Sequence, residues 1–134
     1  MKIEGSCHCG AIVYEAEVDP DSASICHCTD CQTLTGSAYR VVIPAPTEGF
    51  KLKKGTPKIY VKTAESGNQR AQAFCADCGT PIYAAAVSNP TVYSLRVGAI
   101  RQRAQLGRPR RQIWCRSALS WPTDLTGIER HERQ

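Results

Sequence analysis

Seven of the eight cysteines of this chain stand in three short groups, and grouped cysteines are typical metal ligands. We call them the first pair (Cys7 and Cys9), the triplet (Cys26, Cys28 and Cys31) and the last pair (Cys75 and Cys78). Such short spacings suit a metal because one turn of the chain can direct two sulfurs to one point. A lone cysteine is usually a small buried hydrophobic residue, but that interpretation does not account for seven grouped ones.

Four thiolates complete a closed tetrahedral zinc site, whereas three leave one position free for a substrate. The seven cysteines therefore divide into four plus three, which predicts one structural zinc and one reactive zinc, two ions per chain. Spacing alone leaves the pairing open. Cys28 and Cys31 with the last pair would make a ribbon-like C-x-x-C…C-x-x-C site. We favour the first pair with the last pair, because the triplet is compact and this division uses all seven cysteines.

A zinc ion held by three thiolates carries a net charge of −1 and activates water poorly. It is better suited to bind another soft ligand, above all a thiolate. The expected chemistry is therefore sulfur chemistry, in which a thiol substrate is held as its nucleophilic thiolate. An iron–sulfur cluster is a second possibility for the same ligands. A redox pair at Cys75 and Cys78 is a third, although the expected βαβ context is missing.

Other residues near the cysteines receive lesser roles. We expect His8 and His27 to lie behind the ligands or at the surface, because the adjacent cysteines compete better for the metal. Cys115, the eighth cysteine, is expected to be a core residue, with a distant fourth ligand as the alternative. Trp114 and Trp121 are expected to be packing residues.

Composition predicts a single domain over residues 1–134 that is globular, with 42% hydrophobic and 22% charged residues. No apolar run is long enough for a membrane span, and the N-terminus lacks the apolar core of a secretory signal. These features predict a cytoplasmic protein without membrane contact. A reducing compartment favours metal binding over disulfides at the cysteines.

The net charge of +5 is unevenly placed along the chain. Between positions 78 and 123 there are seven arginines and no lysine or acidic residue; they are Arg96, Arg101, Arg103, Arg108, Arg110, Arg111 and Arg116. Such a segment either attracts anions, such as a carboxylate-bearing substrate or nucleic acid, or is a solvated surface. Nucleic acid is the less favoured partner, because no nucleic-acid motif is present and few aromatic residues lie among the arginines.

The pattern of short apolar runs separated by turn residues predicts a mainly β fold with antiparallel sheets and at most short helices. Alternation over residues 12–18 predicts a half-buried strand. Further strands are expected at 24–28, at 39–43 with an end at Pro44, at 59–61, up to Phe74, at 82–83, at 92–97 and at 113–116. Residues 65–68 are expected to form a hairpin turn.

One short helix is expected beside the triplet. Thr29 and Gln32 fit a capping box, with Thr29 as the N-cap, and Gly36 is placed to end the helix. The free N–H groups at such a helix start would lie beside Cys28 and Cys31 and favour thiolate over thiol.

With these motifs in order, the chain resembles the glutathione-dependent formaldehyde-activating enzymes, which are grouped with centromere protein V. The resemblance rests on Gly5-x-Cys7-x-Cys9-Gly10, Cys26-His27-Cys28-x-x-Cys31 with Gly36-Ser37, Glu65-Ser-Gly67, Phe74-Cys75-x-x-Cys78-Gly79-Thr80-Pro81, Gly98 and Trp121. It covers nearly the whole chain. The sequence departs from the family pattern at Gln72, Arg101 and Gln112, where an arginine, an acidic residue and a histidine are common.

The resemblance implies an Mss4-like fold with zinc knuckles. It implies a structural zinc on the first and last pairs and a catalytic zinc on the triplet, whose cysteines would be the catalytic residues. The implied activity is formation or cleavage of the carbon–sulfur bond of S-hydroxymethylglutathione, with glutathione as the thiol partner. Two alternatives stand beside this carbon–sulfur lyase: a zinc-stabilised binding or scaffold protein, and a carrier of thiol adducts without true catalysis. The oligomeric state is not predicted.

Overall fold

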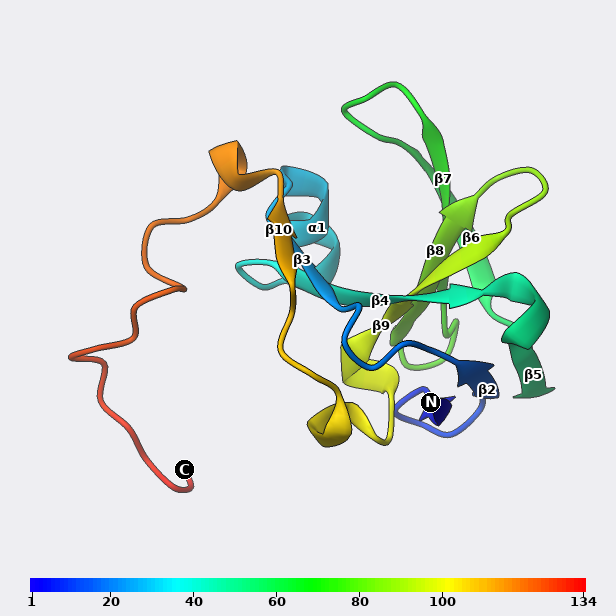
Figure 1. The fold of residues 1–134 in the computed structure, drawn as a ribbon, viewed down its shortest axis with the longest axis horizontal. Helices are drawn as coiled ribbons and strands as arrows, with labels where there is room; N and C mark the ends of the chain where they lie inside the picture. Colours follow the sequence, from blue (N-terminus) through cyan, green and yellow to red (C-terminus); the bar gives the residue numbers. More distant parts are fainter.

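Two β-sheets form the protein in the computed structural model, which describes residues 1–134 (Figure 1). The smaller sheet has the strand order β1-β2-β5, with β1 at Lys2–Ser6, β2 at Val13–Glu17 and β5 at Lys51–Lys54. Side chains of β2 alternate between buried and less buried positions, as expected for a strand with one face on the core. The predicted half-buried strand over residues 12–18 is thus confirmed.

The larger sheet has seven strands in the order β10-β3-β4-β9-β8-β7-β6. Their bounds are β3 Ser24–Cys26, β4 Arg40–Pro46, β6 Lys58–Thr63, β7 Gln69–Phe74, β8 Pro81–Ala86, β9 Val92–Arg96 and β10 Arg111–Ile113. The mainly β prediction is confirmed. The pairing is antiparallel throughout except between β10 and β3, which run parallel. The C-terminal strand therefore adds to the edge of the sheet beside the triplet.

The prediction that β4 ends at Pro44 was wrong, because the strand runs through Pro44 to Pro46 and pairs with β9 along this length. The other neighbour, β3, pairs with β4 only as far as Val42. Beyond that point one edge of β4 needs no N–H donors. Prolines two residues apart direct their nitrogens to the same edge, which explains why the strand tolerates both.

One hydrophobic core joins the two sheets. It contains Ile3, Tyr14 and Ala16 from the small sheet, and Ile43 and Leu95 from the large sheet. An aromatic cluster packs against it, in which the ring centroids of Tyr14 and Phe50 lie 5.2 Å apart and those of Tyr83 and Tyr93 4.2 Å apart. The loops that carry the cysteines are thus anchored in two sheets that share their apolar contacts.

The short helix expected beside the triplet is α1, at Thr29–Thr35, and Gly36 ends it in the left-handed conformation. Its N-cap is Cys28 rather than Thr29, so the predicted capping box was wrong. The Cys28 sulfur accepts a hydrogen bond from the backbone N–H of Cys31 at 3.3 Å, while the Gln32 side chain turns away to other partners. The sulfur thus occupies the position where an oxygen cap usually stands.

The C-terminal part differs from expectation. Strand β10 ends at Ile113, and Cys115–Ser117 form a 3-10 turn instead of continuing the strand. Residues 118–134 contain no helix or strand and extend away from the sheets (Figure 1). Trp121, expected to be a packing residue, is 55% exposed. No helix of the structure has the length and apolar character needed to cross a membrane.

Candidate functional site

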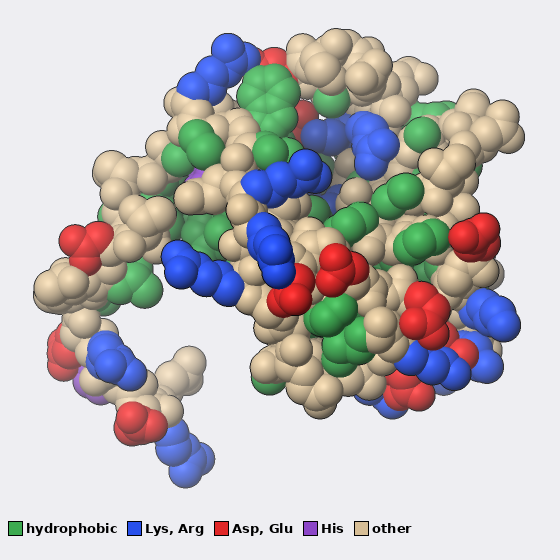
Figure 2. Space-filling model, in the orientation of Figure 1, with side chains coloured by type: hydrophobic (Ala, Val, Ile, Leu, Met, Phe, Trp, Pro, Cys, Tyr) green, Lys and Arg blue, Asp and Glu red, His purple; other side chains and the backbone are tan.

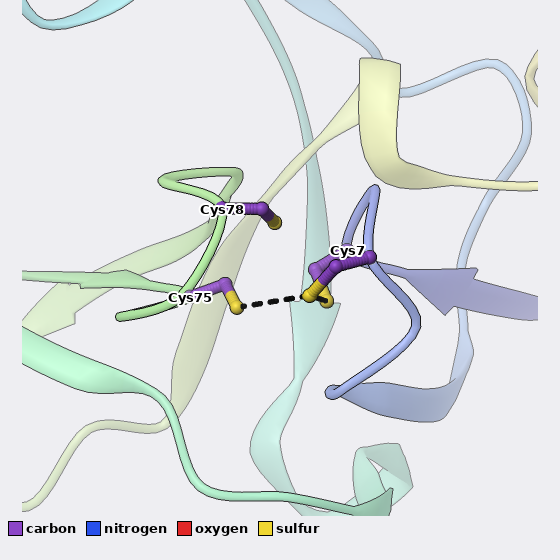
Figure 3. Close-up of side chains that lie close together, drawn as sticks. Cys7, Cys75 and Cys78 are labelled. Atoms are coloured by element: carbon purple, nitrogen blue, oxygen red, sulfur yellow. Dashed lines mark hydrogen bonds between the residues drawn. The ribbon is translucent and has the colours of Figure 1, made fainter.

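The first and last cysteine pairs meet between the two sheets. Cys7 and Cys9 follow β1, and Cys75 and Cys78 lie in the loop between β7 and β8. Figure 3 shows the side chains of Cys75 and Cys78 directed from one loop toward Cys7 on another. Each loop turns at a glycine with positive φ, Gly10 at 78° and Gly79 at 77°, a backbone conformation that other residues rarely adopt. We call this group the four-cysteine cluster.

The spacing of these sulfurs suits a single metal ion. All four sulfurs lie within 4.8 Å of one another. The Sγ atoms of Cys7 and Cys9 are 3.6 Å apart, and those of Cys9 and Cys75 are 3.8 Å apart. Ligand sulfurs about 2.3 Å from a tetrahedral zinc would lie about 3.8 Å from one another. The donor set therefore fits a closed, four-coordinate metal site.

Hydrogen bonds to the sulfurs also support a thiolate cluster. The backbone N–H of Ile12 donates to Cys7 Sγ at 3.2 Å. The Thr80 hydroxyl lies 3.1 Å from Cys78 Sγ, and this hydrogen bond is the main reason why the pKa of Cys78 is lowered to about 5. Thr80 Oγ1 in turn accepts from the backbone N–H of His8, whose ring is exposed at the surface as expected.

The triplet forms a second, separate group, which we call the three-cysteine cluster. Cys26 ends β3, Cys28 caps α1 and Cys31 lies in its first turn, and their three sulfurs lie within 4.8 Å of one another. Cys26 and Cys28 are buried, whereas Cys31 is partly exposed. The structure thus brings the cysteines together in the four-plus-three grouping that we favoured. The ribbon-like pairing of Cys28 and Cys31 with the last pair is not formed.

The surroundings of the three-cysteine cluster are positively charged. The pKa of Cys31 is lowered to about 5, first because of its hydrogen bond with Cys26, and further because of the charges of Arg40 and Arg96. The same hydrogen bond and burial raise the pKa of Cys26. One sulfur of the cluster is therefore ionised at neutral pH even without a metal, which favours capture of a cation by the group.

These three cysteines open onto a cavity of about 180 Å³. Its charged lining residues are all basic, namely Arg40, Lys62, Arg70 and Arg96. A second hollow of about 430 Å³ adjoins it and shares Cys28, Lys62 and Trp114 with it. A ligand with its sulfur at the cysteines can therefore extend toward the loop after β6.

The C-terminal segment braces the cysteine cluster from outside. His27, expected behind the ligands or at the surface, is 2% exposed and hydrogen-bonds through Nε2 to Gln112 Oε1 on β10 at 2.7 Å. Gln32 of α1 donates from Nε2 to the carbonyl oxygens of His27 at 2.8 Å and Ser117 at 2.9 Å. The segment from β10 to Ser117 thus fixes both ends of the loop that carries the triplet.

Sequence reasoning missed or misplaced several residues at this site. Arg40 and Arg70 belong to no motif in the sequence, so sequence reasoning did not predict them as site residues. Trp114, expected to be a packing residue, is only half-buried and lines both hollows, with φ at 57°. Cys115, expected in the core, is exposed and belongs to neither cysteine cluster.

The arginine-rich segment does not form one basic surface. Arg101, Arg110 and Arg116 are exposed and pair with Glu4, Asp21 and Glu65 respectively. Figure 2 shows lysine and arginine side chains interspersed with acidic ones on the face viewed. Arg96 differs because it lies buried in the cavity and donates to Gln72 Oε1 at 2.6 Å. All three departures from the family pattern, Gln72, Arg101 and Gln112, therefore form polar contacts of their own.

Comparisons with known proteins agree with the family resemblance and with the fold. A sequence model of a family described as "Glutathione-dependent formaldehyde-activating enzyme" matches residues 2–117. A solved crystal structure of a protein from Rhodobacter sphaeroides is similar, with a TM-score of 0.62 and 22% sequence identity over 81% of this chain and 98% of the other. At this identity the likeness concerns the fold alone.

Proposed function

Because the chain belongs to the family of glutathione-dependent formaldehyde-activating enzymes, we propose that it is a zinc-dependent carbon–sulfur lyase acting on a thiol–aldehyde adduct of the S-hydroxymethylglutathione type. The observation that carries this proposal is the convergence of three cysteine sulfurs on an open cavity whose charged residues are all basic. The proposed catalytic residues are Cys26, Cys28 and Cys31, and the proposed thiol partner is glutathione.

The two cysteine clusters have different parts in this proposal. The four-cysteine cluster would hold a structural zinc through Cys7, Cys9, Cys75 and Cys78, since four sulfurs leave no free position. The three-cysteine cluster would hold the second ion. When bound there, zinc supplies a coordination position that favours a substrate sulfur in its thiolate form.

The charges around the cavity support cleavage of the carbon–sulfur bond. In this direction the bond breaks with its electron pair on sulfur, while the adduct's hydroxyl loses its proton to water and becomes the aldehyde carbonyl. Arg40 and Arg96 place positive charge where the thiolate forms. A preorganised charge of this kind stabilises developing negative charge in the transition state. In the reverse direction the same charges hold the nucleophilic thiolate beside the incoming aldehyde.

The proposed location is the cytoplasm, where such thiol chemistry meets a reducing environment. None of the eight cysteines forms a disulfide, and the seven in the two clusters need to stay reduced to bind a metal.

The test is exchange between free formaldehyde and its glutathione adduct, followed by NMR on the zinc-loaded protein. We expect saturable exchange above the spontaneous rate, and loss of this excess in Cys31→Ser, because a hard hydroxyl replaces a soft ligand. Cys115→Ser is the matched control, since Cys115 is exposed and lies in neither cluster, and it should exchange like the native protein. Equal rates in the native protein and in Cys31→Ser would instead support the scaffold or carrier alternatives.

A further inference from the structure

Two buried arginines that line the cavity lack the partners that buried arginines usually have. Arg40 is 5% exposed and Arg96 is 8% exposed. The Nε atoms of both side chains are buried without a hydrogen-bond partner, and neither arginine forms an ion pair. Arg96 has one polar side-chain contact, the amide of Gln72. A buried charged group with so few acceptors is costly, so an acceptor for the guanidinium groups is expected to arrive with a ligand.

The charges point to the same conclusion. Three guanidinium groups without carboxylate partners line the cavity, those of Arg40, Arg70 and Arg96. The fourth basic group, Lys62, is paired with Asp30 at 3.0 Å. Burial and the neighbouring charge of Arg40 lower the pKa of Arg96 to about 9, which leaves it protonated at neutral pH. The three charges repel one another in a confined space.

A thiolate ligand alone does not balance these charges. A divalent ion with the three cysteine thiolates and one substrate thiolate has a formal charge of −2, whereas the three arginines contribute +3. One further negative charge completes the balance. A guanidinium Nε–H is also best matched by an oxygen anion, since arginine binds carboxylates through directed N–H···O bonds.

We propose that Arg40 and Arg96 form an oxyanion subsite, so that the preferred ligand of this cavity is a small thiol that carries a carboxylate close to its sulfur. The cysteine cluster receives the sulfur, and the guanidinium N–H groups of the two arginines donate to the carboxylate. This inference rests on the proposed function for the sulfur position only, and it names a smaller thiol in place of glutathione, whose cysteine carboxyl is part of a peptide bond. The arginine subsite stands on its own burial and missing partners.

The test is isothermal titration of the zinc-loaded protein with three small probes. Mercaptoacetate has the thiol and the carboxylate, mercaptoacetamide has the thiol with a neutral amide of the same shape, and glycolate has the carboxylate with a hydroxyl. We expect mercaptoacetate to bind about tenfold more tightly than mercaptoacetamide, the factor of one charge-assisted hydrogen bond. The amide has the more acidic thiol, and this difference acts against the expected preference.

Substitutions test whether the two arginines cause the preference for mercaptoacetate over mercaptoacetamide. Arg40→Gln and Arg96→Gln should each reduce the ratio between the two thiols toward one. Arg101→Gln is the matched control, because Arg101 is exposed, does not line the cavity and pairs with Glu4 at a distance of 2.9 Å. This variant should keep the native ratio. If a glutamine variant does not fold, Arg40→Lys and Arg96→Lys keep the charge but remove the guanidinium fork, and the ratio should fall part of the way.

The outcomes separate this inference from the proposed function. Equal binding of the two thiols to the native protein would overturn the subsite and leave thiol binding intact. A preference that survives substitution of both arginines would also overturn it. If glycolate binds as tightly as mercaptoacetate and depends on both arginines, the oxyanion subsite stands and the proposed thiol function falls.

Discussion

Cys28 combines two properties that are usually carried by different residues. Its sulfur belongs to the three-cysteine cluster and also caps α1 by accepting the N–H of Cys31 at 3.3 Å. A thiolate at this position also interacts favourably with the positive end of the helix. The side chain that positions Cys31 is thus itself a candidate ligand, so that the local helix and the sulfur cluster depend on one another.

Serine and alanine at position 28 separate these two properties. Cys28→Ser should lose the metal of the three-cysteine cluster but keep the helix cap, because serine is a good N-cap and a poor soft ligand. Cys28→Ala should lose both. We expect both variants to retain one zinc per chain in elemental analysis. In denaturant titrations the serine variant should be more stable than the alanine variant by about 1 kcal/mol. Two zinc ions in Cys28→Ser would show that Cys28 is not a ligand.

At the scale of elements, the segment from β10 to Ser117 holds the loop of the triplet in place. β10 pairs parallel with β3, and the backbone N–H of His27 donates to the carbonyl oxygen of Ile113 at 3.1 Å. Beyond Ala118, whose N–H donates to the carbonyl oxygen of Cys115, the backbone hydrogen bonds link only nearby residues of the tail, such as Asp124 to Trp121. The family match also ends at position 117. The contacts that hold the three-cysteine cluster in place therefore end at Ser117, before the tail of residues 118–134.

Two truncations test this division. Removal of residues 118–134 should leave two zinc ions per chain and an unchanged affinity for thiols, because this tail has no helix or strand and packs little. Removal of residues 110–134 also removes β10, the Gln112 contact and the Ser117 acceptor. It should lower the zinc content toward one, with the four-cysteine cluster retained. Loss of zinc in the shorter deletion, or retention of both ions in the longer one, would contradict the assigned role of the segment.

Patterns local in sequence predicted their part of the site well. The compact triplet and the count of seven grouped cysteines favoured the four-plus-three grouping that the structure shows, and Gly36 was rightly placed at the end of the helix. What failed depends on the tertiary structure. Arg40 becomes a cavity residue because β4 lies beside β3 and β9, and nothing near it in sequence signals this. The parallel position of β10 depends on a free sheet edge, and the cap at Cys28 depends on a sulfur acting where an oxygen was expected.

At the scale of the whole molecule, the four-cysteine cluster connects the two sheets. Cys7 follows β1 of the small sheet, and Cys75 follows β7 of the large sheet, and both are buried in the shared core. A metal ion bound there therefore links segments 66 positions apart, as the contact between Cys9 and Cys75 shows. The three-cysteine cluster spans only residues 26–31, from the end of β3 to the first turn of α1, so a metal bound there would contribute less to the fold.

Stepwise removal of metal should reveal this difference. With increasing chelator, the ion of the three-cysteine cluster should leave first, because it has three protein ligands and opens onto a cavity. Far-UV circular dichroism should change little at this step, while thiol binding is lost. The second ion should leave only as the protein unfolds, since binding to a closed four-thiolate site is linked to folding. Loss of this ion should lower the free energy of unfolding by several kcal/mol.

Cys75→Ser is the matched variant, and it should unfold at much lower denaturant concentration than Cys31→Ser. Release of both ions in one step, together with unfolding, would show that the two clusters are equally structural.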